Sequence, residues 1–225
     1  MQKIASSNGW VPRFNEITKK VDMFVGTIRS AQKASGQIFD DTHDGKYTDK
    51  NTYASCPVRL NISKEKWNDI AKFYNLGFFK RIKLNSQRGR VQEYVRFGDT
   101  QPAMVISESP LIIAAFSDEM DAVAMLKFPN DYVNKYNLKK YSRLITVNTY
   151  SYRNIYNDIF AGKNYLKRYC DFNPNIGEFL SSETEKIERH KQNIPESIWR
   201  YVQGLGEAYI IKHNNKCRNG FWFVK

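Results

Sequence analysis

The stretch PLIIAAFSDEMDAVAMLKFP, residues 110–129, decides how the rest of the chain is interpreted. Residues 111–116 contain no polar side chain, so we expect a strand in the middle of a sheet that is covered on both faces. Ser117 or Asp118 is a suitable N-cap for a helix, because the carboxylates that follow would meet the positive end of its dipole. The stretch therefore predicts a buried strand that leads directly into a helix.

The composition is that of a folded globular protein. Apolar residues make up 41% of the 225 residues and charged residues 26%, which excludes a disordered or fibrous chain. No apolar run approaches the roughly 20 residues of a membrane helix, and residues 1–14 lack the apolar core of a secretory signal. The three cysteines are far apart, which favours reduced thiols over disulfides or a zinc site. We therefore expect a cytoplasmic protein that does not bind membranes.

Residues 1–57 are expected to lie outside the main body. Apolar residues recur there every three or four positions and predict an amphipathic helix over residues 13–35. The polar, turn-rich segment that follows is longer than the roughly six residues of an ordinary connection, so we expect a long polar loop. Residues 58–225 are expected to form one compact α+β body.

The body begins with a helix and a hairpin in this interpretation. Ser63 caps a helix over residues 64–75, and Gly77 ends it. Residues 78–84 and 91–97 resemble strands, and the glycine-containing segment between them predicts a turn. These two strands form the first half of an antiparallel meander.

The remaining elements complete an α+β fold. Strands at residues 103–107 and 111–116 finish the meander of four. The later part of the chain is expected to add a strand, two helices and a closing hairpin, at residues 143–149, 178–192, 195–203, and 207–213 with 221–224. The predicted fold is a mainly antiparallel sheet, built from about residues 78–117 and the later strands, with helices covering it.

Positive charge is the strongest global signal. The 35 Lys and Arg residues against 23 Asp and Glu residues leave a formal net charge of +12, which attracts polyanions. The surplus lies in two zones. The first lies between residues 64 and 96, and its members in the predicted hairpin, which are the proposed contacts, are Lys80, Arg81, Lys83, Arg88, Arg90 and Arg96. The second lies between residues 134 and 170 and comprises Lys135, Lys139, Lys140, Arg143, Arg153, Lys163, Lys167 and Arg168.

Tyrosines accompany the second zone, and eight of the 14 in the chain lie between residues 132 and 172. Those proposed to stack on bases are Tyr136, Tyr152, Tyr156 and Tyr165. Tyrosine beside Lys and Arg also suits a core rim or a protein interface. Likewise, basic residues on an edge hairpin can serve only to prevent aggregation.

Two acidic groups offer an alternative with a metal ion. Asp40, Asp41 and His43 lie close together in the long loop and are hard ligands suited to magnesium, manganese or zinc. A second group, at the predicted start of a helix, comprises Asp118, Glu119 and Asp121, with Glu93 and Asp99 as further candidates. The simpler interpretations are a solvated turn and partners of a helix dipole.

The leading hypothesis is a non-enzymatic protein that binds DNA or RNA and uses no cofactor, catalytic residue or metal. Walker, Rossmann, kinase and serine-hydrolase spacings are absent from the sequence, so the corresponding enzyme classes have no support. The alternatives are a metal-dependent nuclease and a structural or assembly protein, for example of a virus or phage, that binds an acidic protein partner.

Overall fold

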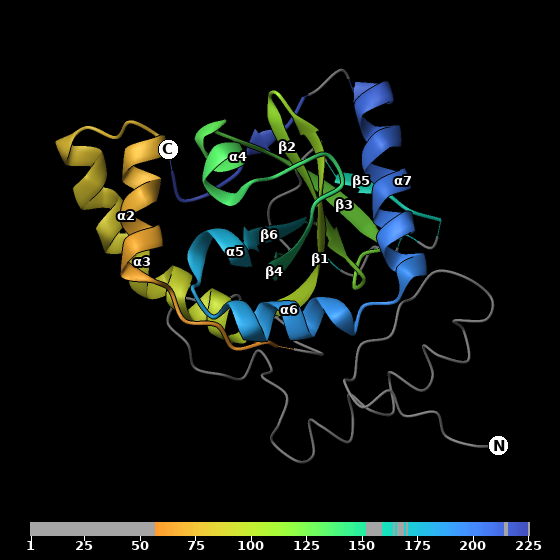
Figure 1. The fold of residues 1–225 in the computed structure, drawn as a ribbon, viewed down its shortest axis with the longest axis horizontal. Helices are drawn as coiled ribbons and strands as arrows, with labels where there is room; N and C mark the ends of the chain where they lie inside the picture. Colours follow the sequence, from red (N-terminus) through yellow and green to blue (C-terminus); the bar gives the residue numbers. More distant parts are fainter. Residues whose placement is uncertain are drawn as a thin grey trace, which may run out of the picture.

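A curled antiparallel sheet forms the centre of the fold (Figure 1). The computed structural model describes residues 57–151, 159–163, 165, 169, 171–213 and 216–224. The sheet has seven strands in the order β5-β3-β2-β1-β4-β6, and β7 pairs in parallel with β3. The strands are β1 Asp99–Glu108, β2 Leu111–Ser117, β3 Ala122–Phe128, β4 Arg143–Ser151, β5 Ile159–Ala161, β6 Asp171–Ile176 and β7 Arg218–Asn219. The predicted α+β class is confirmed.

Helices cover both faces of the sheet. They are α2 Lys64–Phe73, α3 Phe78–Phe97, α4 Asp131–Tyr136, α5 Gly177–Leu180, α6 Thr184–Gln192 and α7 Glu196–His213. Figure 1 shows α7 along one side of the sheet, while α2 and α3 stand at the opposite end of the molecule. None of the helices in the described ranges is long and apolar enough to cross a membrane. The predicted N-terminal helix and long loop lie outside the described residues.

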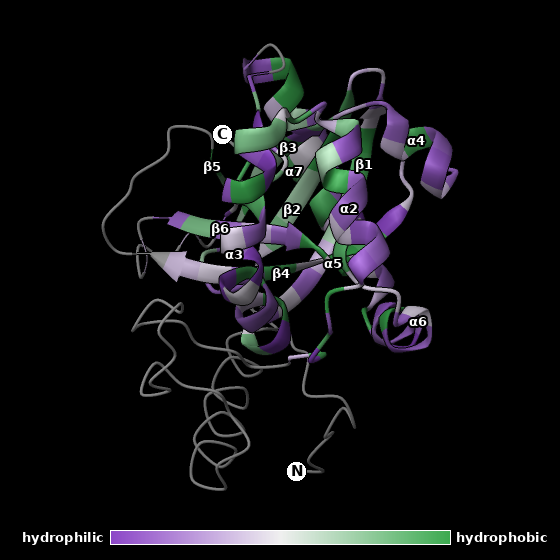
Figure 2. Ribbon diagram, turned by 90° about the vertical axis from the view of Figure 1, so that its left-hand side faces the viewer, coloured by the Kyte–Doolittle hydropathy of each residue, from purple (hydrophilic) through white to green (hydrophobic). Residues whose placement is uncertain are grey.

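The predicted buried strand is confirmed as β2, in which every residue is buried. Its alternate side chains enter two separate apolar cores. Leu111, Ile113 and Ala115 join the core that contains α2 and α5, whereas Ile112 and Phe116 pack in the core beneath α7. Figure 2 shows hydrophobic residues concentrated on the central strands, while α6 is mostly hydrophilic. Both faces of the sheet are therefore covered, as the sequence predicted.

The prediction that a helix begins at Ser117 or Asp118 is wrong. Residues 118–121 form a tight turn, and β3 pairs back onto β2 from Ser117↔Ala122 to Leu111↔Phe128. Asp121 has a φ of 47°, a left-handed conformation that Asp tolerates better than most residues and that reverses the chain. Pairing with β2 satisfies the backbone of β3, and this tertiary context outweighs the helix-start signal.

The predicted hairpin at residues 78–97 is also wrong, since these residues form the single helix α3. The predicted helix over residues 178–192 is divided into α5 and α6, and the short helix over residues 195–203 continues as α7 to His213. The closing hairpin is therefore absent from the described part of the chain, and its predicted first strand is the last part of α7.

The C-terminal segment connects the two edges of the curled sheet. In β7, next to β3, Arg218 Nη2 lies 3.0 Å from Asp171 Oδ1 and Nη1 donates to the carbonyl of Phe172 at 2.9 Å, both in the distant edge strand β6. Trp222 Nε1 donates to Asn175 Oδ1 of β6 at 3.2 Å. The segment containing Arg218 and Trp222 therefore holds the sheet in its curled form.

We expect Arg218→Met to destabilise the protein by about 3 to 5 kcal/mol, because Asp171 is fully buried and would lose this cation. Urea unfolding of the purified variant measures the change. The matched control is Arg200→Met, whose pair with Glu196 spans 3.9 Å on the surface and should contribute less than about 1 kcal/mol. Equal effects of the two substitutions would contradict the role of Arg218.

Two glycines of α7 give opposite predictions. A Cβ at Gly204 would meet nothing within 4 Å, so Gly204→Ala should stabilise the helix by about 1 kcal/mol. A Cβ at Gly206 would lie 2.7 Å from Ile106 Cδ1 and 3.0 Å from Ala114 Cβ. Gly206→Ala should therefore destabilise by about 1 to 3 kcal/mol through overpacking. Urea unfolding of both variants is the test, and destabilisation by Gly204→Ala would argue against a continuous α7.

Candidate nucleic-acid interface

The helices α2 and α3 form a helical hairpin at one end of the molecule (Figure 1). Ser63 caps α2 as predicted, its side chain accepting a hydrogen bond from the Lys66 amide at 3.5 Å. Trp67 is buried, and its Nε1 donates to Asn85 Oδ1 of α3 at 3.1 Å, which ties the two helices together. Residues 74–77 connect the helices, with Tyr74 rather than the predicted Gly77 as the C-cap of α2. The Ser63 cap thus fixes the start of α2, and the buried Trp67 joins α2 to α3.

One narrow face attaches α3 to the rest of the protein. Its buried residues are Leu84, Val91 and Val95, which are spaced as one side of a helix requires. This spacing is the signal that distinguishes the helix from the predicted hairpin. Gly89 suggested a turn, but glycine inside a helix lowers its stability by only about 1 kcal/mol relative to alanine. Most of the surface of residues 78–89 is therefore left to solvent.

The six proposed contacts of the first zone all lie on α3, which has no other Lys or Arg and a single carboxylate, Glu93. Lys80, Lys83 and Arg88 are exposed and form no ion pair within the part of the chain that the structure describes. Arg81 Nε donates to the carbonyl of Leu76 at 2.8 Å. The charge predicted for a hairpin is thus carried by an exposed helix.

Two cations of the second zone, Lys135 and Arg143, form ion pairs. Lys135 is paired with Asp69 and with Glu65, the latter at 3.2 Å. Arg143 Nη2 lies 2.6 Å from Glu196 Oε2, and its guanidinium lies over the ring of Trp199. Lys140 lies over the ring of Tyr141 at 4.8 Å. The members outside the described residues are Arg153, Lys167 and Arg168, and the same holds for Tyr152 and Tyr156.

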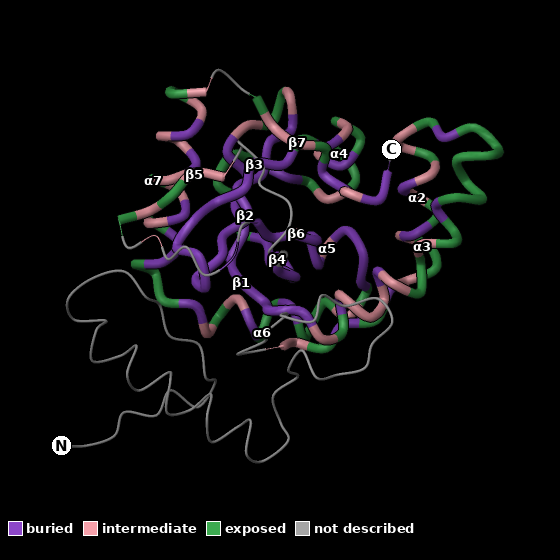
Figure 3. The backbone as a smooth tube through the Cα atoms, turned by 180° about the vertical axis from the view of Figure 1, so that it is seen from behind, coloured by how far each residue is buried: buried purple, intermediate pink, exposed green. Residues whose placement is uncertain are grey.

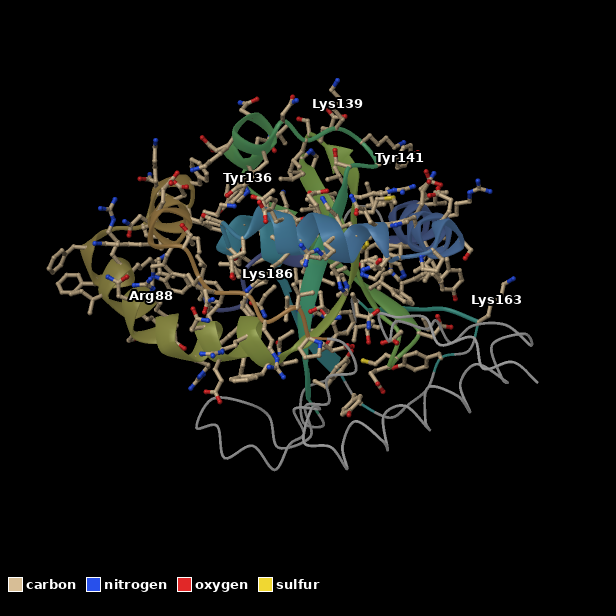
Figure 4. The ribbon with its side chains drawn as sticks, turned by 60° about the horizontal axis from the view of Figure 1, so that its bottom comes forward. Arg88, Tyr136, Lys139, Tyr141, Lys163 and Lys186 are labelled. Carbon is tan, nitrogen blue, oxygen red and sulfur yellow. The ribbon has the colours of Figure 1, made fainter. Side chains whose placement is uncertain are left out.

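The two basic zones point in different directions. Figure 4 shows Arg88 and Lys163 at opposite ends of the molecule, with Lys139 on a third side. No single basic stripe therefore joins these three residues. Since Lys80, Lys83 and Arg88 on α3 are exposed and pair with no described carboxylate, the helix is the stronger candidate for contact with a polyanion.

Two of the candidate stacking tyrosines are packed against the core. Tyr136 shares one face of α4 with Tyr132, as their spacing predicted, and the two rings stack with centroids 6.0 Å apart. The ring of Phe179 lies 4.9 Å from that of Tyr136. Tyr165 is half-buried against the same core. Base stacking by Tyr136 and Tyr165 stays a prediction, and it would require their rings to be shared with this core.

The tip of the helical hairpin carries exposed apolar residues that the sequence interpretation missed. Phe78, Phe79 and Ile82 have 72%, 83% and 54% of their surface exposed. Figure 3 shows this tip as an exposed segment at the edge of a largely buried fold. A helical interpretation would have revealed them, because they lie on the face opposite Leu84.

The acidic groups meet only in part. Tyr150 donates to Asp99 Oδ2 at 2.7 Å. Burial raises the pKa of Tyr150 well above its ordinary value, and the nearby carboxylates of Asp99, Asp118 and Glu119 raise it further. Asp121 instead accepts a hydrogen bond from Tyr201 at 2.9 Å. Within the described ranges, no three His, Cys, Asp or Glu side chains are grouped as a metal ion requires. The group of Asp40, Asp41 and His43 lies outside those ranges, so the nuclease alternative stays a prediction.

A second feature that the sequence did not indicate is a pocket of about 620 Å³ beside α5 and α6, within the size range of small-molecule sites. Its lining includes Lys66, Tyr136, Glu178, Ile187 and Lys191. Burial raises the pKa of Glu178 to about 7, although Lys191 at 3.4 Å opposes the shift. Burial also lowers the pKa of Lys66, whose ammonium donates to the carbonyls of Glu178 and Ser181. Lys66 and Glu178 therefore make these polar contacts with other groups of the same protein.

Glu178 should make stability depend on pH. Because its folded pKa is raised, its stabilising contribution is complete below the unfolded pKa near 4.5 and is lost as pH rises through about 7. We expect Glu178→Gln to gain about 1 to 3 kcal/mol relative to the wild type between these limits. Thermal or urea unfolding across that range tests it. Glu188→Gln, which alters an exposed partner of the same Lys191, is the control and should show no such trend.

No family model, curated protein or solved structure matches the chain. The function must therefore be inferred from charge and geometry, and among the described residues the exposed basic helix α3 is the strongest feature on which to base it.

Proposed function

We propose that the protein binds nucleic acid without enzymatic activity, and that α3 is the element that contacts the phosphates. The observation that carries the proposal is the concentration of cations on this helix, of which Lys80, Lys83 and Arg88 have no carboxylate partner among the described residues. Unbalanced surface cations attract counterions, and a polyanion that replaces many small ions gains their release as free energy.

The dimensions of α3 suit this role. A helix of 20 residues is about 30 Å long and about 10 to 12 Å wide, which matches the width of about 12 Å of a DNA major groove. Leu84 is the one buried residue between Phe78 and Gly89, so this part of the helix is largely available to a partner, whereas most of residues 90–97 are buried or half-buried. The helix is therefore both rigidly attached and accessible.

The cations of α3 also fall on two sides of its exposed face. Arg81 and Arg88 are seven residues apart and lie on one flank, while Lys83 and Arg90 have the same separation on the other. Two parallel rows of cations fit the two rows of phosphates that border a groove, or the backbone of a single strand that crosses the helix. Guanidinium groups suit this task because they bind phosphate oxygens in pairs.

A salt titration tests the proposal. We expect labelled DNA and RNA to bind with an affinity that falls steeply as salt rises. The double variant Lys83→Gln/Arg88→Gln should reduce the slope of log K against log salt by about 1 to 2 and weaken binding at every salt concentration. Glutamine keeps a high helix propensity, so α3 should remain folded.

The matched control is Arg189→Gln/Lys212→Gln, which removes the same charge from exposed positions outside α3 and outside both basic zones. Its salt slope should remain close to that of the wild type. Absence of binding to either nucleic acid at low salt would refute the proposed function. An equal loss in both double variants would show that overall charge, and not α3, is responsible.

A further inference from the structure

We propose that the tip of the α2–α3 hairpin binds unpaired bases, with Phe78 and Phe79 stacking on them while Arg81 and Lys83, on either side of the apolar face, hold the adjoining phosphates. The inference rests on the proposed function and names its ligand as single-stranded nucleic acid. The apolar side chains at the tip stack on the bases. The cations beside them and further along α3 bind the phosphates.

Packing in the core does not explain why the tip is apolar. Phe78 and Phe79 contact each other edge to face, with ring centroids 5.6 Å apart, and both are largely exposed. Ile82 extends the same outer face by one turn. In the described part of the chain, Ile211 is comparably exposed, but it stands near the end of α7 without exposed apolar neighbours of similar size. The tip is thus a cluster, which marks an interaction site better than isolated apolar residues do.

Charge around the cluster selects the partner. Residues 78–83 read FFKRIK, in which every residue that is not apolar is basic and none is acidic. Rotation along the helix places Arg81 on one side of the apolar face and Lys83 on the other. A complementary partner therefore needs flat apolar surfaces with negative charges close on both sides. Unpaired nucleotides have this chemistry, because each base face adjoins a phosphate.

Other partners fit less well. A paired duplex buries its base faces, so it would leave Phe78 and Phe79 exposed. Insertion into an anionic membrane requires an apolar face that extends along a helix. In α3 that face ends after Ile82, because Ser86 and Gly89 follow on the same side.

Fluorescence anisotropy with a short single-stranded oligonucleotide and a duplex of equal length tests the inference. We expect Phe78→Ala/Phe79→Ala to weaken single-strand binding by about tenfold or more, as expected when stacked aromatic rings are removed. Duplex affinity and the salt slope should not change. A 2-aminopurine base in the single strand should be quenched by the wild-type protein and much less by the variant.

Ile211→Ala is the matched control, since it removes a comparably exposed apolar side chain at a distance from the tip. It should bind both oligonucleotides like the wild type. Equal single-strand affinity of the wild type and the phenylalanine variant, with duplex binding intact, would overturn this inference and leave the proposed function standing. If the wild type bound neither oligonucleotide, the proposed function itself would be refuted. Phenylalanine-dependent binding to phosphatidylserine vesicles, without a single-strand effect, would assign the tip to a membrane.

Discussion

The burial of β2 on both faces is the constraint on which the rest of the structure depends. A strand covered on both faces needs two backbone partners and two apolar layers, and β2 has β1 and β3 beside it and a core on each face. The helix α7 supplies one layer, and the other is formed by α2, α5 and the C-terminal segment. The helix α3 adds Leu84, Val91 and Val95 to the second layer, and its first half, residues 78–89, is held by Leu84 as its one buried residue. The outer surface of residues 78–89 is consequently free of packing constraints.

This freedom explains the character of α3. A surface that packs against nothing can carry like charges close together, since water screens their repulsion. It can also carry exposed phenylalanine, provided that the cluster remains small. Neither feature stabilises the fold, so both are better explained by contact with a partner. The second basic zone differs, because Lys135 and Arg143 contribute ion pairs that connect elements of the body.

The sequence predicted the elements whose local and tertiary signals agree. Unbroken apolar residues identified β2, and Ser63 located the start of α2. The sequence-based prediction failed where a single residue suggested a turn or the end of a helix. Gly89 and Gly204 indicated breaks, yet burial of Val91 and Tyr209 keeps both helices continuous. The acidic residues after Ser117 resembled a helix start because nothing local shows that residues 122–128 pair with β2.

The candidate site was predicted in composition but not in arrangement. The basic residues of α3 were identified, whereas their secondary structure was not. Counting charges along the sequence also could not show that Asp69 and Glu65 lie beside Lys135, since that contact joins α2 to α4. The exposed tip was missed for a related reason, because Phe78 and Phe79 have the composition of a strand and only a helix places them outside.

The connection between Arg218 and Asp171 has a consequence for how the chain folds during synthesis. The meander of β1, β2 and β3 can form as soon as these residues have left the ribosome, because its contacts are local in sequence. The curl of the sheet cannot be fixed until residue 218 emerges. Until then, the outer edges of β3 and β6 lack their C-terminal cover in the nascent chain, and such edges recruit other strands. We therefore expect these two edges to be least protected in the interval between translation of residues 176 and 218.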